Sequence, residues 1–121
     1  MFDLIKKHPL SCLETVWACV NGTIVRFPKS DPLRWNSLLR ILVPHNDIPL
    51  PGDIILYRDL SVDHYIHAQF VVGNGLVFEL HGDGWDPVSR QCYPCIRRPK
   101  SLSLLREGHP YFQAYKVQKG G

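Results

Sequence analysis

The chain has 121 residues, a formal net charge of +3 and 45% hydrophobic residues, the size and composition of one soluble globular domain. Its basic residues are scattered, which argues against a nucleic-acid-binding surface. No apolar run approaches the roughly 20 residues that cross a bilayer, so no membrane span is predicted. The N-terminus lacks the apolar core of a secretory signal, so synthesis in the cytoplasm without a signal peptide is expected.

The first predicted helix begins at a capping box. Ser11 and Glu14 have the spacing at which each side chain satisfies the backbone N–H of the other. Apolar residues at i, i+3, i+4 and i+7 extend the helix to about Val20, before the stop signal Asn21-Gly22. Cys12 therefore occupies the first helical position, where the helix dipole and free N–H groups favour a thiolate.

The central feature of the sequence is Ile66–His81, IHAQFVVGNGLVFELH, which predicts two strands joined at Gly73-Asn74-Gly75. Side chains alternate between the faces of a strand, so His67 lies on one face of the first strand. Glu79 and His81 share a face of the second strand, on the side where a partner for His67 would lie. Titratable groups in so apolar a hairpin indicate a purpose, because burying them without one costs several kcal/mol.

The remaining segments complete an expected α+β fold, with N-terminal helices packed on a small antiparallel sheet of about four strands. One domain covers residues 1–121. In chain order, the other segments are a helix from Ser30 to Pro44, a loop from His45 to Pro51, a strand at Ile54–Tyr57, an irregular stretch at Gly82–Pro99, a helical turn at Ser101–Glu107 and a last strand at Tyr111–Val117.

A cysteine at a helix start, followed by a histidine at a strand start and a strand-borne polar residue, is typical of a thiol nucleophile with its base and orienting group. Cys12 is the candidate nucleophile and His67 the candidate base. Glu79 is the candidate third member, with His81 as the alternative on the same face. Backbone N–H groups at the helix start, including that of Cys12, are candidates to hold an oxyanion.

These motifs resemble the NlpC-type papain-like cell-wall peptidases. The second motif of that family, Gly-Asp before an apolar strand, matches PGDIILY at Pro51–Tyr57, and the third, histidine before a Gly-x-Gly turn, matches HAQFVVGNG at His67–Gly75. The resemblance covers about residues 11–82, and YFQAYKV resembles the closing strand of the family. It implies a papain-like fold and a cysteine hydrolase that needs no cofactor, with Cys12, His67 and Glu79 as its triad.

The substrate that the resemblance implies is a peptidoglycan stem peptide, cut at an amide bond. The protein would be a bare catalytic domain, as in phage-borne lytic enzymes or bacterial toxins, acting in the periplasm or cell wall after delivery by a phage or a secretion machine. An immunity or carrier protein is a further expected partner. Trp85 and His64 are candidate substrate-binding residues beside the cleft.

Two alternatives remain open. The residues flanking Cys12 differ from the family pattern, and a family tyrosine upstream of the nucleophile has no counterpart, which favours a catalytically inactive binding or structural module of a phage or an inhibitory protein. A triad directed at proteins, as a protease or an acyltransferase, is the other alternative. Cys92 and Cys95 suggest a redox pair or a metal site, but a structural zinc site needs four ligands at recognisable spacing, and none is predicted.

Overall fold

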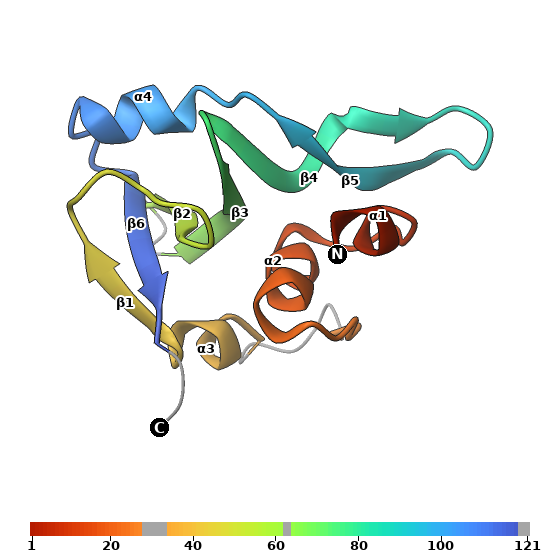
Figure 1. Cartoon of the computed structure of the whole chain (residues 1–121), viewed down its shortest axis with the longest axis horizontal. Coiled ribbons are helices and arrows are strands. Elements are labelled where there is room, and N and C mark those ends of the chain that lie inside the picture. Colours follow the sequence, from red (N-terminus) through yellow and green to blue (C-terminus); the bar gives the residue numbers. More distant parts are fainter. Residues whose placement is uncertain (28–33, 62–63, 119–121) are drawn as a thin grey trace.

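The computed structural model describes residues 1–27, 34–61 and 64–118, with the side chains of Arg34 and His64 excepted (Figure 1). The helices in these ranges are α1 (Phe2–Ile5), α2 (Cys12–Asn21), α3 (Arg34–Leu39) and α4 (Ser101–Arg106). The strands are β1 (Leu42–His45), β2 (Ile54–Asp59), β3 (His64–Gly73), β4 (Leu76–Asp86), β5 (Gln91–Arg97) and β6 (Phe112–Val117).

All six of these strands form one sheet, in the order β1-β6-β2-β3-β4-β5, with antiparallel neighbours. The β3–β4 hairpin lies within this sheet, between β2 and β5. Its turn places Gly73, Asn74 and Gly75 at φ values of 118°, 56° and 78°, which glycine and asparagine adopt more readily than other residues. The predicted hairpin is thus confirmed.

The two faces of the sheet bury two separate apolar clusters. The larger cluster joins α1, α2 and α3 to one face and contains Leu13, Val16, Leu56 and Phe78. The smaller cluster joins α4 to the other face, and its buried members come from the neighbouring positions of the same strands: Ile55, Val71 and Val77. This period-2 alternation is what a sheet covered on both faces requires.

The sheet opens between β3 and β4, and α2 packs at this opening. The register between the two strands runs from Phe70 paired with Phe78 to Gly73 paired with Leu76. Beyond Phe78 the partner of β4 is β5, and the two strands extend together past the rest of the sheet (Figure 1). Because α2 contacts both β3 and β4, its N-terminus lies near the point where the strands part.

The expected α+β papain-like class is wrong, because the protein is mostly sheet. Six strands replace the expected four, and the helices are short, with ten residues in α2 and four to six in the others. The predicted helix to Pro44 stops at Leu39, and Leu42–His45 instead pairs with β6. A helical spacing of leucines does not exclude a strand when a free sheet edge is available. The start of that prediction, at 30–33, lies outside the described residues.

The second large correction concerns Gly82–Pro99, where strands form in place of the irregular stretch. β4 continues to Asp86, and β5 pairs with it across a shift of register between Leu80 and Trp85. Glycine at position 84 permits this close pairing, because a Cβ there would lie 1.9 Å from the carbonyl oxygen of Tyr93. Gly82 and Gly84, which in the sequence suggest a loop, thus belong to an irregular part of β4.

The helices Cys12–Asn21 and Ser101–Arg106 and the strands Ile54–Asp59 and Phe112–Val117 agree with the predictions to within a few residues at each end. The short helix α1 was not predicted. Among the described residues, no helix has the length and apolar character needed to cross a membrane.

Candidate active site

The N-terminus of α2 holds Cys12 in a well-defined position. The Ser11 hydroxyl accepts the backbone N–H of Glu14 at 3.2 Å, and the Glu14 carboxylate accepts that of Ser11 at 2.9 Å, so the predicted capping box is present. Glu14 is buried and also accepts the backbone N–H of Phe27 at 2.6 Å. The helix start is therefore held by two kinds of hydrogen bond. One kind lies within the capping box, and the other joins Glu14 to Phe27 after the helix.

Cys12 faces β3 from this helix start. Its Sγ lies 4.0 Å from the carbonyl oxygen of Ile66, and the thiol is close enough to His67 to raise the pKa of that ring. The thiol is only partly buried. A reactive cysteine needs such access together with a nearby basic group, and both are present at this position.

His67 bridges Cys12 and Glu79. Its Nε2 atom donates to the Glu79 Oε1 atom at 2.5 Å, which leaves Nδ1 as the ring nitrogen for the thiol. The His67 side chain is 30% exposed and that of Glu79 is 1% exposed. The ring thus has one nitrogen on a buried carboxylate and the other toward a partly accessible thiol, and the carboxylate selects its tautomer and orientation.

Glu79 is held by further donors besides His67. Gln69 Nε2 lies 3.1 Å from each carboxylate oxygen, and Arg97 Nη1 donates to Oε2 at 3.0 Å. Ser101 Oγ in turn donates to Gln69 Oε1 at 2.6 Å. Gln69 and Ser101 are both buried. A buried carboxylate with donors on both oxygens stays ionised, because hydrogen bonds to the charged form offset the loss of water.

The charges of this cluster depend on one another. Burial alone would raise the pKa of Glu79, but hydrogen bonds from His67, Gln69 and Arg97 outweigh burial and lower it below 4.5. Burial opposes charge on His67 as well, yet its interactions with Cys12 and Glu79 raise its pKa from 6.5 to about 9. His67 is therefore an imidazolium at neutral pH, the form that can donate a proton to a leaving group.

Two backbone donors at the start of α2 are free among the described residues. The N–H of Glu14 is taken by the Ser11 side chain and that of Thr15 by the Ser11 carbonyl. The N–H groups of Cys12 and Leu13 have no acceptor in the described part of the chain. Such donors beside a nucleophile form an anion-binding position.

The other candidate residues do not join the cluster. His81, the alternative third member, accepts the backbone N–H of Asp83 at its Nδ1 atom, 3.0 Å away, and lies 3.5 Å from the Asp83 carboxylate. Trp85 is 52% exposed and pairs with Cys92 in the β4–β5 hairpin. It lines a shallow pocket of about 670 Å³ together with Ser11, the residue before Cys12. His64 begins β3, but its side chain lies outside the described residues.

Sequence reasoning missed Gln69, Arg97 and Ser101 around Glu79. The period-2 pattern already placed Gln69 beside His67 on one face, and this signal could have identified it. Arg97 was hidden because its strand was interpreted as irregular. Ser101 is 32 residues from Gln69 in the chain, so no local pattern connects the two.

A second histidine–carboxylate pair was also missed. His45 ends β1, and its Nε2 atom lies 3.0 Å from Asp53 Oδ2. Asp53 is buried and also accepts the backbone N–H of Leu50 at 2.9 Å. The Nδ1 atom of His45 accepts the N–H of Asp47 at 3.1 Å, so the Nε2 atom carries the proton in this pair. The Asp of the Pro51–Tyr57 motif therefore organises the loop before β2.

No group of three or more His, Cys, Asp or Glu side chains in the described ranges could hold a metal ion. Cys92 and Cys95 are free thiols in β5, three residues apart. An odd spacing along a strand directs the two side chains to opposite faces, which separates them. Comparison with protein families finds no match to this chain, and comparison with curated proteins finds none either.

Proposed function

We propose that this protein is a cysteine hydrolase that cleaves an amide bond. The observation that carries the proposal is His67, whose Nε2 atom hydrogen bonds to buried Glu79 and whose pKa is raised by Cys12 and Glu79 together. In this proposal Cys12 is the nucleophile, His67 the general acid and base, and Glu79 the group that orients the ring. The arrangement supports the proposal, because thiol catalysis needs a base near the nucleophile and a group that orients the base.

The reaction would proceed in two steps. The Cys12 thiolate attacks the carbonyl carbon, and the oxyanion that forms is held by the free N–H groups at the start of α2. Protonated His67 then gives its proton to the amide nitrogen, the C–N bond breaks, and an amine leaves an acyl thioester on Cys12. In the second step, neutral His67 takes a proton from water as the oxygen attacks the thioester, and the C–S bond then breaks, which releases the carboxylic acid and restores the Cys12 thiolate beside protonated His67.

The proposed substrate is a peptidoglycan stem peptide, for which the support is the likeness of PGDIILY and HAQFVVGNG to the motifs of NlpC-type cell-wall peptidases. This support is confined to the motifs. In this proposal Trp85 contacts the substrate, since its exposed ring and Ser11 line the same pocket. The ring supplies a flat apolar surface in the pocket that Ser11 also lines.

The first test is the rate of iodoacetamide labelling at each cysteine as a function of pH. We expect Cys12 to label rapidly at about pH 6 to 7, below the range of an ordinary thiol. Cys19 serves as an internal control, because burial raises the pKa of its thiol to about 12. Cys92 is the control for access, since its side chain is partly exposed as that of Cys12 is. Labelling of Cys12 no faster than that of Cys92 would contradict a poised nucleophile.

The second test is hydrolysis of defined stem peptides, followed by mass spectrometry, with wild type and Cys12→Ala. We expect loss of cleavage in the variant with little change in its thermal midpoint, since Cys12 is partly exposed and outside the apolar clusters. If Cys12 labels rapidly but no stem peptide is cleaved, Cys12 is a reactive thiol and the proposed substrate is wrong. Equal cleavage by the variant would reject the hydrolase.

A further inference from the structure

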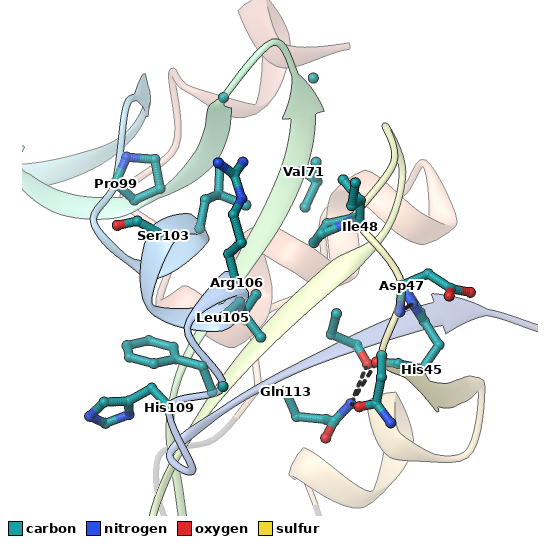
Figure 2. A pocket seen from close by; sticks show the side chains of 18 of the residues that line it. His45, Asp47, Ile48, Val71, Pro99, Ser103, Leu105, Arg106, His109 and Gln113 are labelled. Atoms are coloured by element: carbon teal, nitrogen blue, oxygen red, sulfur yellow. Dashed lines mark hydrogen bonds between the residues drawn. The ribbon is translucent and has the colours of Figure 1, made fainter.

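A pocket lies away from Cys12, on the face of the sheet that α4 covers. It has a volume of about 850 Å³ and lies between α4, the 73–75 turn and the loop 46–50 (Figure 2). Neither Cys12 nor His67 nor Glu79 lines it. The pocket is therefore a separate feature, and the proposed hydrolase does not use it.

Part of the lining of this pocket is apolar. Val71 and Phe112 come from the sheet, and Leu102 and Leu105 come from α4. Ile48 lies on the loop side of the pocket in Figure 2, and this residue is 74% exposed. An isoleucine this exposed beside an apolar hollow loses contact with water when a ligand covers it, which favours binding of an apolar body.

Two arginines line the same pocket, and neither has a carboxylate partner among the residues that the structure describes. Arg98 donates from Nη1 to the carbonyl oxygen of Asn74 at 3.3 Å, which uses one of the five N–H donors of a guanidinium. Gly75 makes room for it, because a Cβ at position 75 would lie 2.5 Å from Arg98 Nη1. Arg106 extends from α4 along the pocket (Figure 2). Unpaired guanidinium groups beside an apolar surface are suited to a carboxylate.

The wall opposite α4 is held in place by hydrogen bonds. Gln113 Nε2 donates to the His45 carbonyl oxygen at 2.8 Å and to Asn46 Oδ1 at 3.5 Å, as the dashed lines in Figure 2 show. Asp53 accepts the N–H of Leu50, and His45 accepts that of Asp47. One end of the loop is thus anchored to β1 and β6, and the other end to Asp53, the residue before β2. A preformed pocket binds without the cost of ordering its wall.

We propose that this pocket binds a small organic carboxylate with an apolar body, such as a medium-chain fatty acid. The apolar chain would lie against Val71, Leu105 and Phe112, and the carboxylate would accept hydrogen bonds from Arg98 and Arg106. Asp47 is the one carboxylate of the lining, and in Figure 2 it lies on the loop side, across the pocket from Arg106. The arrangement therefore favours an anion at the arginines.

The test compares three ligands of equal chain length, which are octanoate, 1-octanol and octylammonium. Binding to the full chain is followed by calorimetry and by the NMR shifts of the Val71 and Leu105 methyl groups. We expect octanoate to bind with a stoichiometry of one, and about tenfold more tightly than octanol, since a charge-assisted hydrogen bond contributes at least that factor. Octylammonium should bind more weakly than octanol.

Matched variants locate the site. Arg98→Gln and Arg106→Gln should each weaken octanoate binding by about tenfold and leave octanol binding unchanged. Asp47→Asn should leave octanoate binding equal or tighter. Arg26→Gln is the control, because Arg26 contacts Glu14 at the start of α2, outside this pocket.

Several results would overturn the proposal. Absence of saturable octanoate binding would do so, and so would equal affinity for the three ligands, which would indicate an apolar surface without anion recognition. Octanoate binding that Arg26→Gln weakens as much as Arg98→Gln would indicate a response to net charge alone. Cys12→Ala retains every residue of this pocket. Octanoate titration of that variant therefore tests the pocket separately from the proposed hydrolase.

Discussion

Two histidines of this protein each contact a buried carboxylate, and the two pairs differ in what lies on the far side of the ring. His67 Nε2 is 2.5 Å from Glu79, and His45 Nε2 is 3.0 Å from Asp53. Nδ1 of His45 accepts a backbone N–H from Asp47. The corresponding atom of His67 is left for the Cys12 thiol.

This difference shows that a histidine–carboxylate contact does not by itself define a reactive site. At His45 both ring nitrogens are used by the fold, so the ring links β1, the loop and β2. At His67 the carboxylate occupies one nitrogen and leaves the other free to exchange a proton. The partner of the second nitrogen decides which pair carries chemistry.

The largest expected difference is in the reactivity of Cys12. In His67→Gln, iodoacetamide labelling of Cys12 at pH 7 should fall by about thirtyfold, because an ordinary thiol with a pKa near 8.5 is only about 3% ionised at that pH. Hydrolysis should fall by about a hundredfold or more, the usual contribution of a general acid and base. His45→Gln should change neither rate by more than about twofold, since the His45 ring has no contact with the thiol.

Thermal denaturation of both variants is the control for this comparison. A loss of Cys12 labelling in His45→Gln, in a protein that remains folded, would show that the two pairs are coupled and would remove the distinction between them.

The next effect concerns the pH dependence that Glu79 imposes on His67. In wild type the hydrolysis rate should fall at high pH with a midpoint near the His67 pKa of about 9. Glu79→Gln removes the negative charge that stabilises the imidazolium, so this basic limb of the pH–rate profile should move toward 6.5, the ordinary pKa of histidine. Asp53→Asn, the matched change in the other pair, should leave the limb in place. An unmoved limb in Glu79→Gln would show that Glu79 does not tune His67.

The same pair should make stability depend on pH. Folding raises the His67 pKa from 6.5 to about 9, so the folded state binds this proton more tightly than the unfolded state does. The stabilisation is complete below about pH 6.5 and is lost as the pH rises through about 9. Urea unfolding from about pH 6 to about pH 10 should show this decline in wild type and a flatter dependence in His67→Gln. Equal slopes in the two proteins would contradict the raised pKa.

The smallest predicted effect is at Ser101, which touches neither histidine. Ser101→Ala removes the donor to Gln69 Oε1 and leaves that buried oxygen without a partner, at a cost of about 1 to 3 kcal/mol in unfolding free energy. Because Gln69 also donates to Glu79, hydrolysis should fall by only a few fold. Ser103→Ala is the matched control, since Ser103 is exposed on the same helix and donates to the carbonyl oxygen of Lys100. Equal losses of stability in the two variants would contradict a special role for Ser101.

Local patterns predicted the parts of the fold that local interactions decide. The capping box at Ser11 and Glu14 placed Cys12 at the start of a helix, and the Gly73-Asn74-Gly75 turn placed the hairpin. The alternation along that hairpin also put His67 and Glu79 on matching faces. A side-chain period of two in each strand is enough for this, once the turn sets the register.

Other features depended on contacts that are distant in the chain. Whether Leu42–His45 and Gln91–Arg97 form strands depends on the sheet edges of β6 and β4, which those segments pair with. The predicted papain-like fold failed for this reason, since the motifs around Cys12 and His67 are local and the strand order is not. β4 pairs with β3 near the turn and leaves it beyond Phe78. Glu79, next to that point, therefore reaches His67, and His81 does not.

The sequence by itself determined the helix start, the central hairpin and the three residues of the candidate site, because capping, turn geometry and strand alternation act over a few neighbouring residues. Only the tertiary structure decided that Gln69, Arg97 and Ser101 surround Glu79, that His45 is bound to Asp53, and that two arginines line an apolar pocket beside α4. Those arrangements join segments tens of residues apart, and they follow from how the strands and helices pack, which no short stretch of sequence specifies.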